Sequence, residues 1–200
     1  MLTDSGLRDF LDTAAAATPA PGGGSVSALC GALGASMASM AANFTLGRKK
    51  FEGVREQVEP LLACSERVRL ELTDLVDEDA RAYEALRAAQ RSSDEDASAK
   101  AAKDAAAVPL RVVELSLELL CACRELLAVV NPALLSDVGV AAALAQAAME
   151  GGALNVEVNL PATADPDYIA STRKKLLGAL HEGRSVRDEV VAYVTERIAR

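Results

Sequence analysis

A glycine-rich turn, Gly22-Gly23-Gly24-Ser25, is the first feature of this sequence that could bind a ligand. Glycines let the backbone approach a ligand closely, and a turn that opens a helix offers free N–H groups and the positive end of the helix dipole. It lacks the Gly-Lys-Ser/Thr of a phosphate-binding loop and the preceding strand of a dinucleotide fingerprint. The turn therefore predicts a site for a small polar ligand, or only a tight connection between helices.

Charged residues that could transfer protons follow in two places. Lys49 and Lys50 lie beyond a long uncharged stretch, where they could donate a proton, pair with a carboxylate, or only stabilise a helix C-terminus. Asp77 and Asp79 belong to one acidic run, which is usually a solvated helix face. Asp79 and Tyr83, however, are four residues apart and share one side of a helix.

Polar residues beside apolar stretches form a further candidate group: Asn131, Asp137, Asn155 and Asn159. Asparagine amides both donate and accept hydrogen bonds, which suits the edge of a pterin. Asp137 could instead be a helix cap. Residues 155–160 alternate apolar and polar, which predicts an extended segment with Asn155 and Asn159 on the same side.

The chain has one histidine, His181, so neither a Ser/His/Asp nor a Cys/His nucleophile arrangement can be proposed. No Cys/His zinc spacing exists. The four cysteines lie in apolar helical patterns, which is typical of reduced core residues in a cytoplasmic protein. Acid–base chemistry would then depend on Lys, Asp, Glu or Tyr.

The composition predicts closely packed helices that would position these residues. Hydrophobic residues make up 50% of the chain and are mostly Ala, Leu and Val, with no Trp. Ala and Leu favour helices, and small side chains let helices approach each other. The net charge of −8, without a Lys/Arg stripe, argues against nucleic acid and anionic membranes as partners.

The uncharged stretch from Ser25 to Gly47 is long enough to cross a membrane. Its serines, Asn43 and Thr45 make it only weakly hydrophobic, so we interpret it as a helix buried in a bundle or dimer, not as a membrane span.

Hydrophobic periodicity and breaker residues predict an all-α bundle of long helices, a single domain over residues 1–200. The glycine-rich turn comes before the buried small-residue helix. The first expected helix begins at Thr3 or Ser5 and ends at Ala17, and the second begins at Ser25, its N-cap. The next two cover 54–91, with a limit or kink at Pro60, and 95–130, with a cap at Ser93 or Asp94 and a bend at Pro109. The fifth covers 136–150 and ends at Gly151-Gly152, the sixth begins at Asp165 or Asp167, and the last lies between Val186 and Ala199.

Three blocks of the sequence together resemble one family. Residues 19–54, which begin PAPGGGS, residues 75–86, which read LVDEDARAYEAL, and residues 131–160 are similar, in this order, to the formiminotetrahydrofolate cyclodeaminase/methenyltetrahydrofolate cyclohydrolase family. The resemblance implies all-helical homodimers that act on one-carbon tetrahydrofolates without a metal or redox cofactor. The cyclodeaminase closes 5-formiminotetrahydrofolate to 5,10-methenyltetrahydrofolate with release of ammonia; the cyclohydrolase hydrolyses the methenyl bridge to the 10-formyl compound.

The resemblance also suggests roles for residues, with a small-molecule folate as the ligand. Asp79 or Asp137 could be the base, and Lys49 or Lys50 the acid or electrostatic partner. The catalytic candidates are Lys49, Asp79 and Asp137, and the substrate-binding candidates are Gly22, Gly23, Gly24, Ser25, Lys50, Asp77, Asn131, Asn155 and Asn159.

One segment departs from the family pattern. Residues 88–108 lack the usual proline and, after Arg91, the arginine, for which Lys100 or Lys103 could substitute. We expect a cyclodeaminase, with a cyclohydrolase, a non-catalytic folate-binding dimer, or a purely structural helical protein as alternatives.

Overall fold

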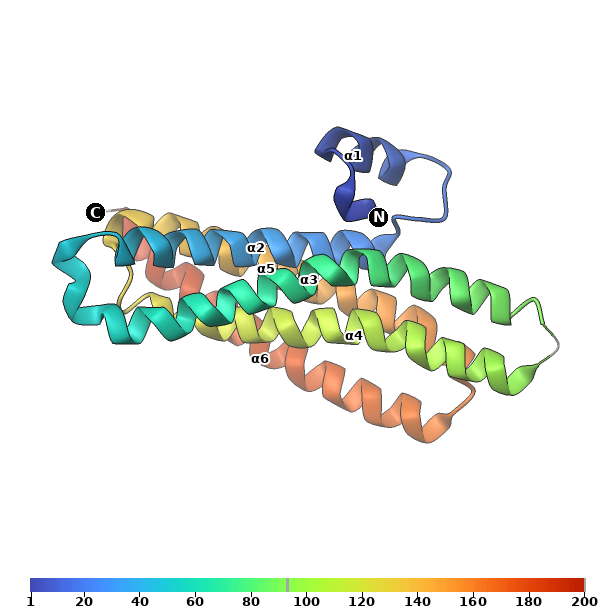
Figure 1. The fold of residues 1–200 in the computed structure, drawn as a ribbon. Helices are drawn as coiled ribbons and strands as arrows, with labels where there is room; N and C mark the ends of the chain where they lie inside the picture. Colours follow the sequence, from blue (N-terminus) through green and yellow to red (C-terminus); the bar gives the residue numbers. More distant parts are fainter. Residues whose placement is uncertain (93, 200) are drawn as a thin grey trace.

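The computed structural model describes residues 1–92 and 94–199, which fold as α-helices joined by short 3₁₀ turns and contain no strand. Helices α2 to α6 lie side by side in a long bundle, whereas α1 packs outside it near the N-terminal end of α2 (Figure 1). The predicted all-α fold is confirmed. The helices are α1 (Leu7–Ala15), α2 (Gly23–Leu46), α3 (Arg55–Ala89), α4 (Glu95–Leu126), α5 (Leu135–Asn159) and α6 (Pro166–Ile198), and the 3₁₀ turns are Leu2–Asp4, Lys49–Val54, Pro132–Leu134 and Leu160–Thr163.

Helix α2 packs against α3 and α5 through small residues, which confirms the prediction of a buried small-residue helix. Ala28, Ala35 and Ala38 are fully buried. A Cβ added at Gly34 would lie 3.0 Å from the carbonyl oxygen of Ala141, so the two backbones approach closely there. Small residues therefore set the spacing between α2 and α5.

Two segments, Gly23–Leu46 and Pro132–Thr163, are long and apolar enough to span a membrane by composition alone. Within the bundle, 61% of the first apolar window and 44% of the second are buried. Packing against neighbouring helices accounts for the apolar character of α2.

Helix α5 continues to Asn159, so the predicted helix end at Gly151-Gly152 and the predicted extended segment over 155–160 are wrong. The glycines serve packing. A Cβ at Gly151 would lie 2.3 Å from Ser27 Oγ, and one at Gly152 would lie 3.1 Å from the Pro109 carbonyl oxygen. Their missing side chains let α5 approach α2 and α4.

Several predicted boundaries also need correction. The first predicted helix is a 3₁₀ turn followed by the shorter α1, and α4 ends at Leu126. Both α3 and α4 run through their prolines. The last two predicted helices form one helix, α6, whose N-cap Asp165 accepts a hydrogen bond from the Tyr168 N–H. Asp94 caps α4, and Ser93 lies outside the described residues.

Candidate functional site

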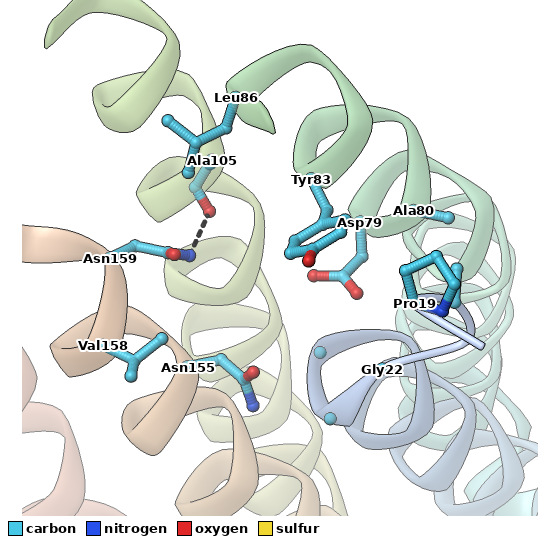
Figure 2. Close-up of a pocket in the computed structure, with 13 residues that line it drawn as sticks. Pro19, Gly22, Asp79, Ala80, Tyr83, Leu86, Ala105, Asn155, Val158 and Asn159 are labelled. Atoms are coloured by element: carbon cyan, nitrogen blue, oxygen red, sulfur yellow. Dashed lines mark hydrogen bonds between the residues drawn. The ribbon is translucent and has the colours of Figure 1, made fainter. Parts of the chain in front are cut away.

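The N-terminus of α2 meets α3 and α5 at a cavity of about 200 Å³. Figure 2 shows Asp79 and Tyr83 of α3 on one side of this space and Asn155 and Asn159 of α5 on the other. The lining residues are Pro19, Ala20, Gly22, Gly23, Gly24, Asp79, Ala80, Tyr83, Leu86, Ala105, Asn155, Val158 and Asn159. The structure thus brings together the glycine turn, Asp79 and both α5 asparagines, as the sequence predicted.

Ser25 holds the Asp79 carboxylate against the start of α2. The Ser25 N–H donates a 2.8 Å hydrogen bond to Asp79 Oδ2, and the Ser25 hydroxyl lies 2.9 Å from the same oxygen. The hydroxyl is also 2.8 Å from the Val76 carbonyl oxygen, so its single proton has two acceptors. Helix N-termini favour a negative charge.

Ser25 is not the N-cap that the sequence suggested. Gly22 occupies the N-cap position, and Ser25 lies in the first turn of α2. Its place in the site comes from the hydrogen bonds to Asp79, which no local helix-start rule describes.

Gly24 is required for this arrangement, and Gly23 lets the Asn155 side chain approach α2 closely. A Cβ at Gly24 would lie 2.0 Å from Asp79 Oδ1, and a Cβ at Gly23 would lie 3.0 Å from Asn155 Nδ2. Any side chain at position 24 would therefore displace the carboxylate. The glycines let α3 and α5 side chains reach the backbone of α2.

Burial raises the pKa of the half-buried Asp79 carboxyl, and the hydrogen bonds from the Ser25 hydroxyl and N–H offset that rise only in part. The net pKa is above the ordinary value for aspartate. A carboxylate whose pKa is closer to the working pH is a better general base, because it binds the transferred proton more strongly.

The α5 side of the cavity combines amides with an apolar wall. Asn155 Nδ2 donates to the Gly151 carbonyl at 2.8 Å, and Asn159 Nδ2 donates to the Ala105 carbonyl at 3.0 Å. These bonds fix both side chains and, since no donor among the described residues binds either Oδ1, leave each Oδ1 available as an acceptor. Together with Val158, they form a surface suited to a flat heterocycle that carries N–H groups at its edge.

Four predicted site residues lie elsewhere in the chain: Lys49, Lys50, Asn131 and Asp137. Lys49 follows the far end of α2, which spans about 36 Å at 1.5 Å per residue. The Asn131 N–H donates to Thr45 Oγ1 near that end, and the Asn131 side chain caps a 3₁₀ turn. Asp137 lies in the first turn of α5, at the opposite end of that helix from Asn159. Within one chain, these residues do not contribute to the cavity.

Asp77 also lies outside the cavity. It is buried, and it accepts hydrogen bonds from the Leu2 N–H and, at 2.6 Å, from the Thr3 hydroxyl. Burial pushes the pKa of Asp77 upward, but these hydrogen bonds outweigh it, so the net pKa is below the ordinary value. Asp77 anchors the N-terminal segment to α3, which is a different role from the predicted substrate contact.

The divergent segment 88–108 contributes Ala105 to the cavity wall. Lys100 pairs with Asp104 at 2.7 Å and Lys103 with Asp165 at 2.6 Å. Both lysines thus already have carboxylate partners, and neither lines the cavity in place of the arginine.

Sequence reasoning did not select several lining residues. Leu86 lies seven positions after Asp79, so the helical spacing that singled out Tyr83 could also have identified it, whereas Ala80 is simply the next residue along the chain. Nothing in the sequence pointed to Ala105, which belongs to another helix. Among the described residues, no group of three His, Cys, Asp or Glu side chains could hold a metal ion; the expectation that no cofactor is needed stays a prediction.

Comparison with known proteins gives concordant matches. The model of the formiminotransferase-cyclodeaminase family matches residues 6–177. A crystal structure of formiminotetrahydrofolate cyclodeaminase from Thermotoga maritima superposes with a TM-score of 0.85 at 31% identity, and the match covers 98% of this chain and 97% of that one.

Curated relatives carry two kinds of name. A methenyltetrahydrofolate cyclohydrolase from Methylorubrum extorquens is 32% identical, over 96% of this chain and 97% of the relative. Formimidoyltransferase-cyclodeaminases from Sus scrofa and Rattus norvegicus are 36% and 34% identical, over 90% and 92% of this chain but 35% and 36% of the relatives. The chain thus spans about a third of the length of these mammalian relatives.

Proposed function

Because this chain belongs to the formiminotransferase-cyclodeaminase family, we propose that it closes the formimino group of 5-formiminotetrahydrofolate onto N10 and releases ammonia. It is an enzyme of the folate one-carbon cyclodeaminase/cyclohydrolase kind. The observation that carries the proposed reaction is the Asp79 carboxylate, held by Ser25 in a cavity that α5 lines with two amides. The transferase activity in the names of the longer relatives is not part of the proposal.

The proposed reaction needs a base and an acid in turn. N10 attacks the carbon of the protonated formimino group, a new C–N bond forms as the C=N π electron pair moves onto the formimino nitrogen, and the Asp79 carboxylate takes the N10 proton. The protonated Asp79 then gives that proton to the departing nitrogen. The C–N bond to this nitrogen breaks, its electron pair leaves with ammonia, and the N5 lone pair completes the methenyl bridge. A raised pKa suits a carboxyl that must do both.

The cavity supports a pterin in this position. The Asn155 and Asn159 Oδ1 atoms could accept hydrogen bonds from ring N–H groups, while Val158 and Leu86 would contact the ring faces. This would place N5 and N10 beside Asp79.

A cyclohydrolase is the second candidate, because the Methylorubrum extorquens relative matches over nearly its whole length. In that reaction, Asp79 would take a proton from the water that attacks the methenyl carbon. The N5–C bond then breaks with its electron pair on N5, which receives the proton from Asp79, while the hydroxyl on the carbon loses its proton to water and becomes the formyl C=O on N10. Both reactions use a base in the same position relative to the one-carbon unit.

Incubating the purified protein with each folate would decide between the candidates. Methenyl-folate absorbance together with released ammonia identifies a cyclodeaminase, whereas loss of methenyl absorbance without ammonia identifies a cyclohydrolase. Asp79→Asn tests the residue assigned as the base in either reaction. Asp74→Asn is its matched control, since Asp74 is an exposed aspartate of the same helix outside the cavity. Folate binding without turnover would identify a non-catalytic member, and turnover of neither folate contradicts the enzymatic proposal.

We further propose the homodimer that the family resemblance implies, in the cytoplasm. Exposed apolar side chains on α2 and α5, including Leu33 and Val140, offer a surface for a second copy. Light scattering on the purified protein would measure its mass. A monomer at micromolar concentration contradicts this part of the proposal.

A further inference from the structure

A second depression continues from the cavity along the outside of α3. It has a volume of about 510 Å³ and shares Pro19 and Tyr83 with the cavity, while Glu84, Arg87 and Arg91 complete its lining. The Tyr83 side chain, 42% exposed, therefore borders both spaces. A ligand that leaves the cavity past Tyr83 enters this groove.

Helix α3 places three chemically different side chains along this path. Asp79, Tyr83 and Arg87 are four residues apart in turn, so they lie along one side of the helix. At 1.5 Å per residue, Asp79 and Arg87 are about 12 Å apart along the axis. The order is a carboxylate base, an aromatic ring and a guanidinium group, and Arg91 follows just beyond the helix.

The two arginines differ from most others in this protein, because neither has a carboxylate partner among the described residues. Arg91 Nε donates to the Arg87 carbonyl at 3.1 Å, and an Arg87 Nη donates to the Gln90 side chain at 3.3 Å. By contrast, Arg67 and Arg111 both bind Glu71. The remaining N–H groups of Arg87 and Arg91 are available to a ligand carboxylate, which a guanidinium fork binds well.

The cavity alone is too small for a whole folate. Its volume of about 200 Å³ is below the ~300–1,000 Å³ that is usual for small-molecule sites. A folate has a flat ring system, then an aminobenzoyl ring, then a glutamate with two carboxylates. This sequence of groups matches the order of cavity, Tyr83 and arginines along α3.

We propose that Arg87 and Arg91 bind the glutamate carboxylates of the substrate, with the aminobenzoyl ring against Tyr83. This inference rests on the proposed function, and it assigns specificity-determining residues beyond the reacting centre. The arginines contact a part of the substrate that does not change in the reaction, so they lower KM and leave kcat unchanged.

Glu84, which lines the same groove, offers a second test of whether the groove binds a negatively charged group. Its carboxylate lies beside the path and would repel the tail, so the groove carries two positive charges and one negative. Glu84→Gln should lower KM for the natural substrate, and raising the salt concentration should weaken the effects of all three charged residues.

The experiment compares folates with and without the glutamate. Calorimetry would measure the Kd values of tetrahydrofolate and tetrahydropteroate for the wild type and for the double variant Arg87→Ala/Arg91→Ala. Turnover of the corresponding formimino or methenyl compounds would be measured for the same two proteins. We expect the double variant to weaken binding of the glutamylated compound by about 3- to 10-fold, as for exposed ion pairs, and to leave the pteroate unchanged. Arg81→Ala is the matched control, because Arg81 is an exposed arginine of α3 that lines neither space.

The outcomes separate the inference from the proposed function. Equal weakening of both compounds, or none, overturns the arginine assignment even if the enzyme turns over normally. Selective weakening of the glutamylated compound supports it even if no turnover is found, in which case only the proposed reaction fails. A protein that binds neither compound contradicts both.

Discussion

Asp79 and Ser25 are joined through two donors of one residue, since the Ser25 N–H and hydroxyl both lie within 2.9 Å of Asp79 Oδ2. The first turn of α2 thereby fixes the position of a carboxyl on α3. Asp79 Oδ1 has no such donor among the described residues. The contact leaves one oxygen for a substrate proton while the other is held in place.

The activity should rise with pH as Asp79 loses its proton. Because burial raises the pKa of Asp79, the midpoint should lie above the ordinary aspartate value of about 3.9. Asp79→Asn should lower kcat by about 10²- to 10⁴-fold, the usual contribution of a general base. The measurement is the pH–rate profile of both proteins; a wild-type midpoint at or below the ordinary value would count against this role.

Folding stability gives an independent check on the same group. A carboxyl whose pKa is raised in the folded state binds protons more tightly there than in the unfolded chain. Its contribution is therefore fully present below the unfolded pKa and is lost as pH rises through the folded pKa. Asp79→Asn should remove this loss, so urea unfolding should show less decline above about pH 4 than in the wild type.

Gly24→Ala should damage both stability and activity. Its Cβ would lie 2.0 Å from Asp79 Oδ1, so the carboxyl or the helix must move. We expect a loss of about 1–3 kcal/mol in the free energy of unfolding and a large loss of turnover. Gly178→Ala is the control in an open helical position, where the substitution should stabilise by about 0.5–1 kcal/mol. A fully active Gly24→Ala enzyme would exclude Asp79 from catalysis in its observed position.

Asn155→Asp should shift the pH–rate profile to higher pH. The new carboxyl would face Asp79 across the cavity, and a nearby negative charge disfavours ionisation of the first. Asn159→Asp is a useful comparison, since Asn159 lies one helical turn further along α5 and its side chain bonds to the Ala105 carbonyl of α4. The shift should be larger for Asn155→Asp, and equal shifts would show that the two positions face the base alike.

Asp77→Asn should affect stability more than catalysis. The Asp77 carboxylate anchors Leu2 and Thr3, and its lowered pKa means that its stabilisation is present above the ordinary pKa and is lost as pH falls. We expect a cost of about 1.5–3 kcal/mol near neutral pH, typical of hydrogen bonds to a charged group, which shrinks below about pH 4. Denaturant unfolding at two pH values tests this, with KM as the readout for any substrate contact.

Lys49→Ala should change turnover by less than about twofold, a free-energy change of under ~0.5 kcal/mol. Lys49 is exposed and lies at the end of α2 away from the cavity. A strong loss of activity with unchanged folding would show instead that a second copy brings this lysine to the site, as the sequence-based role requires.

Helical periodicity was sufficient to predict the bundle, because Ala- and Leu-rich segments carry their own helix preference. It failed at Gly151-Gly152, where local rules indicate a helix end. The glycines there face Ser27 and Pro109, contacts that only the assembled bundle creates. Asn155 and Asn159 still share a face, because a spacing of four suits a helix as well as a strand.

The candidate site was predicted in part for a similar reason. Residues close to one another on α2 and α3 were found by motif and spacing, as with Asp79 and Tyr83. Lys49 and Asp137 were joined to them by family resemblance, but the lengths of α2 and α5 separate them in space. Local sequence patterns do not determine which ends of long helices lie close together in the folded bundle.

The contact between Gly24 and Asp79 limits how this site can evolve. Gly24 lies in the cavity wall that positions the Asp79 base, and its missing side chain also lets α2 and α3 pack closely. A substitution at residue 24 therefore disturbs both the position of the base and the packing of the helices, so few substitutions there could support a new reaction. The α5 asparagines bond to the Gly151 and Ala105 carbonyls and, among the described residues, to neither Asp79 nor Ser25, so a change at residue 155 or 159 leaves the base in its position. Divergence between an ammonia-releasing and a water-adding enzyme on this scaffold would therefore be expected to accumulate on α5.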